Sequence, residues 1–177
     1  MFLRLFLAAF LLASPWSVAA RQDETPPATE EAPAHPEASP YAEIPEIAAI
    51  AHFEGVRAAA ILQGKRLVAV FGANWCHDSR ALAGWLETPR FRTLTDKHFI
   101  VVYIDAGRPQ DGAGRNMALA ARLGVSDIEG TPNLLVLDPA SGKLLNTPES
   151  AKGWRDAASR SADAIFDELA SYAPDAG

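Results

Sequence analysis

Cys76 is the single cysteine of the chain and its side chain best suited to nucleophilic chemistry. It follows an apolar run (67–71) and a short turn, and it begins a stretch of helical character (76–86). Free N–H groups and the dipole at a helix start favour an anion, so a thiolate is stabilised there. His77 as a cation adds to this effect, whereas the carboxylate of Asp78 opposes it. A small, buried, unreactive cysteine is the alternative that position alone leaves open.

A lone cysteine also limits the chemistry. It excludes an internal disulfide, a four-cysteine zinc site and an iron–sulfur cluster held by this chain alone. His35 is expected to be solvated, and His52 and His98 to be packing or surface residues. The sequence therefore predicts no metal site and no cofactor.

The segment Trp75-Cys76-His77-Asp78-Ser79, placed directly after an apolar strand and turn, resembles the active site of the thioredoxin superfamily. The similarity continues over residues 65–91, 98–107 and 129–146, as in exported thioredoxin-like proteins. It implies a thioredoxin-like α/β fold, a central mixed sheet flanked by helices on both faces.

The resemblance also assigns roles to individual residues. It implies that Cys76 is the nucleophile and that Trp75 is the ring beside it. Thr131 and Pro132 match the family's cis-proline loop, which faces the cysteine and pairs with the backbone of a bound peptide.

Two positions depart from the family pattern. Ser79 stands where the family has its second, resolving cysteine, and Val70 stands where many thioredoxins have a buried acid. A hydroxyl cannot attack a mixed disulfide, so an external thiol must release any adduct. Ser79 is expected either to donate a hydrogen bond to the Cys76 thiolate or to be a helix-surface serine.

The remaining elements are predicted from apolar runs and capping residues. Gly64 is a fitting end for the first helix, and Thr88 and Pro89 a fitting start for the third. Residues 134–137 and 143–145 around a turn at 138–142 predict a hairpin. Alternation of strands and helices indicates an α/β sheet covered on both faces. The expected helices are 45–62, 76–86, one from 89, 116–123 and one over 158–172; the other expected strands are 67–71 and 99–104.

The N-terminal residues 1–43 differ in composition from the rest of the chain. Residues 1–20 have the basic, apolar and small-residue regions of a cleavable signal peptide, with an apolar run too short to span a membrane. Residues 21–43 are acidic and proline-rich, which predicts a disordered linker dispensable for folding. The domain is expected over residues 44–172, followed by a tail at 173–177.

The length of 177 residues suits one domain, and the net charge of -6 makes nucleic acid a poor partner. The sequence predicts a monothiol thiol–disulfide oxidoreductase that is periplasmic or secreted, without stable membrane insertion after cleavage. Its expected partners are protein thiols or disulfides, and a small thiol such as glutathione. The alternative is a redox-inactive module that binds extended peptides in the cis-proline groove.

Overall fold

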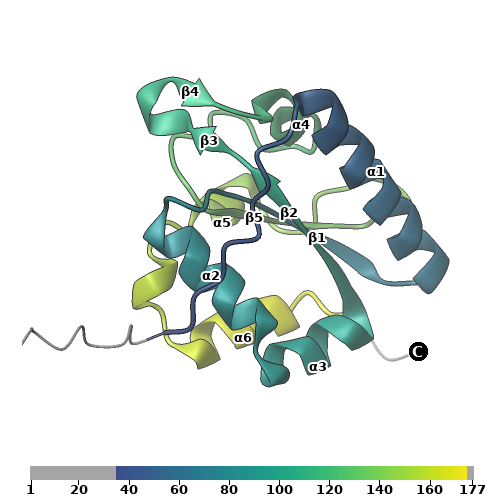
Figure 1. Cartoon of the computed structure of the whole chain (residues 1–177). Coiled ribbons are helices and arrows are strands. Elements are labelled where there is room, and N and C mark those ends of the chain that lie inside the picture. Colours follow the sequence, from purple (N-terminus) through teal and green to yellow (C-terminus); the bar gives the residue numbers. More distant parts are fainter. Residues whose placement is uncertain (1–34, 175–177) are drawn as a thin grey trace, which may run out of the picture. The chain divides into compact units, whose positions relative to one another are not determined.

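The central strand of the sheet is β1 (Arg66–Gly72), which has a neighbour on each side (Figure 1). The computed structural model describes residues 35–174 of the chain. Strand β2 (Phe99–Asp105) pairs parallel to β1, and β5 (Asn133–Leu137) pairs antiparallel to it. The sheet is therefore mixed, as expected. The signal peptide predicted for residues 1–20 lies outside the described residues.

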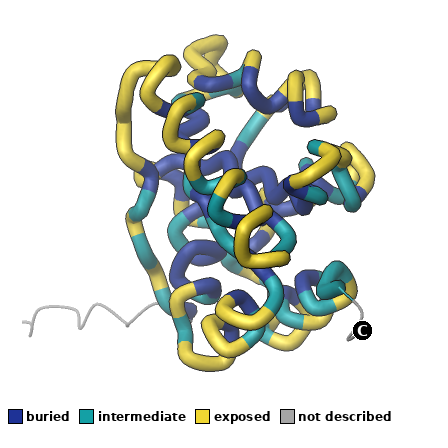
Figure 2. Tube along the Cα trace, turned by 90° about the vertical axis from the view of Figure 1, so that its right-hand side faces the viewer, coloured by how far each residue is buried: buried dark blue, intermediate teal, exposed yellow. Residues whose placement is uncertain are grey.

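Side chains of β1 alternate between two apolar clusters, one on each face of the sheet. Leu67 and Phe71 pack with α1 (Glu46–Gln63) and α4 (Met117–Arg122). Val68 and Val70 enter the other cluster, and three helices cover that face: α2 (His77–Glu87), α3 (Pro89–His98) and α6 (Ala162–Ala170). The α/β class with helices on both faces is confirmed. Figure 2 shows that the buried residues gather at the centre of the described part of the chain, and that the exposed residues lie on its outer helices and loops.

Local signals set the end of α1 and the start of α3 where they were predicted. Gly64 ends α1 in the left-handed conformation with φ of 63°, which a glycine adopts without steric cost. Thr88 precedes α3, and Pro89 is its first residue. No helix in the described residues is long and apolar enough to cross a membrane.

The predicted hairpin is only half formed. The turn and β5 are present, but residues 143–145 make a single isolated bridge between Leu137 and Leu144. The Asn146 side chain takes the place of a strand, because its Oδ1 accepts from Val136 N at 2.9 Å and its Nδ2 donates to Leu134 O at 2.8 Å.

The C-terminal helix is shorter than predicted. A 3-10 turn, η2 (Ala157–Ser159), comes first, and α6 starts after Ser161, whose Oγ accepts from Ala164 N. Four short elements were not predicted: β3 (Gly107–Arg108), η1 (Pro109–Asp111), β4 (Ala113–Gly114) and α5 (Pro148–Lys152).

The prediction of a disordered linker is wrong for residues 35–43, which we call the strap. Tyr41 is buried, its backbone N–H donates to Asn74 Oδ1 at 3.1 Å, and its hydroxyl donates to Ser79 O at 3.1 Å. Two glycines make room for the strap. A Cβ at Gly72 would lie 2.5 Å from the Tyr41 ring, and one at Gly84 would lie 2.3 Å from Pro36 O.

Candidate functional site

Cys76 lies at the junction between β1 and α2, where it is the residue that precedes the first helical position. Its backbone N–H donates to Ala73 O at 3.0 Å, which closes the turn after the strand. The side chain is 8% exposed, and the sulfur lies 3.3 Å from Thr131 O. The start of α2 thus presents a nearly covered thiol to the loop before β5.

The Thr131–Pro132 peptide bond is cis, and this loop comes from a segment more than fifty positions away along the chain. The carbonyl of Thr131 thus lies beside the thiol, and Pro132 follows it through the cis bond. Thr131 is largely buried, and its hydroxyl has no hydrogen-bond partner among the described residues.

Trp75 lies on the surface beside the cysteine. It is 41% exposed, its Nε1 donates to Gly107 O at 3.0 Å, and the Arg108 guanidinium lies 4.4 Å from the ring centroid. The indole is therefore held in place by the β3 segment while one part of its surface stays open to a partner.

Among the described residues, no hydrogen bond joins the side chain of His77 or Asp78 to the Cys76 sulfur. Nδ1 of His77 lies 3.0 Å from Glu37 Oε1, and its Nε2 lies 3.2 Å from His35 Nε2. Asp78 Oδ1 accepts from Ala158 N at 2.9 Å, so this carboxylate joins α2 to η2. Their described partners are structural, and the predicted His77–thiolate interaction is not among them.

Ser79 is completely buried and is not the helix-surface serine considered from the sequence. It lies one helical turn after Cys76, where Arg80 N donates to Cys76 O at 3.1 Å. Its Oγ has no hydrogen-bond partner in the part of the chain that the structure describes, so the predicted bond to Cys76 is not formed.

The strap supplies site neighbours that the sequence did not indicate. Arg80 Nε donates to Glu37 Oε2 at 2.9 Å, and this hydrogen bond lowers the pKa of the Glu37 carboxyl. Burial raises the pKa of Tyr41 well above its usual value. Tyr41 is the one aromatic residue within the acidic, proline-rich residues 21–43, and that was the only signal available.

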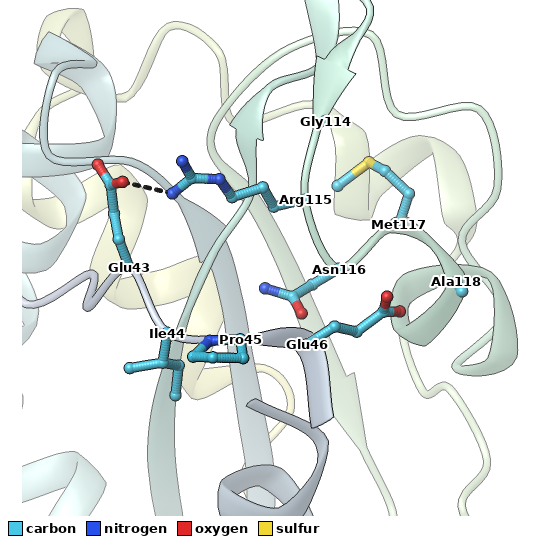
Figure 3. A pocket seen from close by; sticks show the side chains of 9 residues that line it. All are labelled: Glu43, Ile44, Pro45, Glu46, Gly114, Arg115, Asn116, Met117 and Ala118. Atoms are coloured by element: carbon cyan, nitrogen blue, oxygen red, sulfur yellow. Dashed lines mark hydrogen bonds and ion pairs between the residues drawn. The ribbon is translucent and has the colours of Figure 1, made fainter. Parts of the chain in front are cut away.

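A cavity of about 560 Å³ lies elsewhere, between the end of the strap and the β4–α4 connection (Figure 3). Arg115 crosses it to Glu43 at 2.5 Å and also contacts Asp105 at 2.9 Å. Cys76 does not line this cavity, and Arg115, the cation among its lining residues, is already paired with Glu43 and Asp105. We therefore place the candidate site at the junction between β1 and α2, around Cys76.

Comparison with known proteins agrees with this geometry. The sequence profile of a family described as thioredoxin-like matches residues 48–139, a segment that contains Cys76 and the Thr131–Pro132 loop. A crystal structure titled as a disulphide isomerase from Xylella fastidiosa Temecula1 is 33% identical, with a TM-score of 0.65 over 76% of this chain and 96% of that chain. No sequence among the curated proteins matches. The chain therefore belongs to the thioredoxin-like family.

Proposed function

We propose that the chain is a monothiol thiol–disulfide oxidoreductase that acts on disulfides of partner proteins. The observation that carries this proposal is the place of the sulfur, at the start of α2 and 3.3 Å from Thr131 O. A helix start stabilises the thiolate, which is the attacking form. The likeness to a disulphide isomerase supports the same class of chemistry.

The reaction has two exchange steps. The Cys76 thiolate attacks one sulfur of the partner disulfide, a mixed disulfide forms, and the other partner sulfur leaves as a thiolate that takes up a proton. An external thiol then attacks the mixed disulfide and releases the Cys76 thiolate. Because Ser79 carries a hydroxyl in place of a second thiol, the resolving thiol is glutathione or another cysteine of the partner.

The partner is held by the surfaces on either side of the sulfur. Thr131 and Pro132 offer a backbone segment to an extended peptide, and the open part of the Trp75 ring offers an apolar contact. The signal peptide predicted for residues 1–20 supports action in the periplasm or outside the cell. Protein disulfides persist in those compartments.

The test is adduct formation with oxidised glutathione, followed by intact-protein mass spectrometry. We expect the folded chain to gain one glutathione at Cys76 faster than the same chain unfolded in urea. Cys76→Ser is the control and should gain none. A folded-state rate no higher than the unfolded-state rate would contradict an activated thiol.

A redox-inactive peptide-binding module is the second candidate, favoured by the 8% exposure of Cys76 and by Ser79 at the resolving position. In that case labelled extended peptides should bind Cys76→Ser as tightly as the parent chain in fluorescence anisotropy. An unreactive thiol together with such binding would select this function.

A further inference from the structure

Three side chains with metal-binding chemistry meet where the strap crosses the first turn of α2. They are His35 and Glu37 from the strap and His77 from the helix, and one ligand atom of each lies within 4.8 Å of the other two. The thiol–disulfide mechanism uses none of them.

The two imidazoles have the spacing of a shared ligand site. Their Nε2 atoms are 3.2 Å apart, while a tetrahedral ion bound at about 2.0–2.1 Å holds two such nitrogens about 3.3 Å apart. The ring centroids are 4.7 Å apart with planes inclined at 58°. Two rings placed end to end at this nitrogen separation would have their centroids farther apart than 4.7 Å, so the rings converge at an angle.

Glu37 orients the His77 ring so that its Nε2 is free to bind a metal ion. Its Oε1 lies 3.0 Å from Nδ1 of His77, and its Oε2 accepts from Arg80 at 2.9 Å. A ring that donates Nδ1–H to a carboxylate keeps the lone pair on Nε2. A carboxylate that orients a ligating histidine in this way is the usual outer partner in metal sites.

The backbone holds these groups together before any ion binds. Ala38 N donates to Arg80 O at 3.0 Å, and the buried Tyr41 ring anchors the other end of the strap. His35 is 9% exposed, so one ligand is fixed against the protein, whereas the His77 side chain is 57% exposed. The site therefore has a rigid side and an open side where water completes the coordination.

We propose that His35 and His77 bind a divalent transition-metal ion through their Nε2 atoms, with Glu37 orienting His77. Imidazole nitrogen suits zinc, copper(II) and nickel rather than magnesium or calcium. Such an ion joins the strap to α2 at the residue that follows Cys76. The burial of His35 contradicts the expectation of a solvated residue, and this proposal departs from the expectation of no metal site.

The experiment is a Zn²⁺ titration by calorimetry, with the full chain carrying Cys76→Ser so that the thiol cannot ligate. We expect one ion per chain. Adding His35→Ala or His77→Ala should weaken binding by more than about 100-fold, and Glu37→Gln by about 10–100-fold. His52→Ala on α1 is the matched control and should bind like the Cys76→Ser parent.

A second readout separates ligation from folding. Co²⁺ should give visible absorption bands of nitrogen coordination in the Cys76→Ser chain and lose them in Cys76→Ser/His35→Ala, while circular dichroism shows both chains folded. Absence of binding by millimolar Zn²⁺ would overturn the proposal. So would binding that His35→Ala and His77→Ala leave unchanged, which would mark an adventitious surface ion.

Discussion

At the scale of single residues, the distinctive feature of the site is a buried hydroxyl that has no hydrogen-bond partner within residues 35–174. Ser79 Oγ lies one turn after the thiol, among residues that exclude solvent. A thiol at this position loses no existing hydrogen bond and is only slightly larger than the hydroxyl. The position therefore accepts a cysteine more easily than an exposed or hydrogen-bonded serine would.

We expect Ser79→Cys to form an internal disulfide with Cys76 under mild oxidation. With dithiothreitol as the reductant, it should catalyse the reduction of insulin, which the parent chain does poorly. Residues at this spacing share one helix face, so the sulfurs can meet. Val70 still lacks the acid that assists the resolving thiol, so turnover should stay modest. The measurement is the free-thiol count after oxidation. Cys76→Ser/Ser79→Cys is the control, and two free thiols in a folded Ser79→Cys chain would favour the peptide-binding module.

Because of Tyr41, the free energy of unfolding should change with pH in the alkaline range. Its pKa is raised well above 10.0, chiefly by burial, so above about pH 10 the unfolded chain ionises this hydroxyl while the folded chain keeps it protonated. The free energy of unfolding should therefore fall as pH rises, by up to about 1.4 kcal/mol per pH unit for this group.

Urea unfolding between pH 9 and 12 measures this slope, and Tyr41→Phe should make it shallower. At neutral pH the same variant should lose about 1 kcal/mol with the hydrogen bond to Ser79 O. Ile47→Ala, at an exposed position of α1, is the control for both effects. An unchanged slope in Tyr41→Phe would show that Tyr41 ionises freely in the folded chain.

At the scale of elements, the strap depends on glycines in the surfaces that it crosses. Gly55 and Gly84 form a matched pair, since each lies inside a helix. A Cβ at Gly55 meets nothing within 4 Å, whereas one at Gly84 would lie 2.3 Å from Pro36 O.

We expect Gly55→Ala to raise the free energy of unfolding by about 0.5–1 kcal/mol through helix propensity. Gly84→Ala should instead lower it by about 1–3 kcal/mol, because the added carbon meets backbone. Hydrogen exchange at Ala38 N, which bonds to Arg80 O, reports on the strap directly. Equal effects of the two substitutions would mean that the strap does not lie on α2 in solution.

At the scale of the whole molecule, the order of the elements and the two-sided covering of the sheet could be predicted, because their signals are local. Each signal determines structure only a few residues away along the chain: the apolar run forms β1, Gly64 ends α1, and Pro89 begins α3. The place of Cys76 at a helix start could likewise be predicted from its neighbours in the chain. Its contact with Thr131 followed from the resemblance, since no local pattern joins two distant segments.

The strap and the half-formed hairpin could not be predicted, for a shared physical reason. Gly72 makes room for the Tyr41 ring and Gly84 for Pro36, and both glycines belong to other elements, so the strap's own composition says nothing about its place. The Asn146 amide forms the hydrogen bonds that the backbone of a neighbouring strand would form. The alternation of apolar residues, from which strands are predicted, does not reveal a side chain in that position.

The Asn146 amide also covers the outer edge of β5, where another copy of the chain could otherwise add a strand. An open outer strand is a template for edge-to-edge pairing and aggregation. Asn146 occupies both Val136 N and Leu134 O, and Leu145 N donates to Val136 O, so the rim of the sheet at β5 is capped. Asn146→Ala should expose these groups and increase light scattering at high concentration, and Asn146→Asp, which keeps the acceptor, should do so less. We therefore expect Asn146 to hinder strand addition at the β5 edge of the sheet.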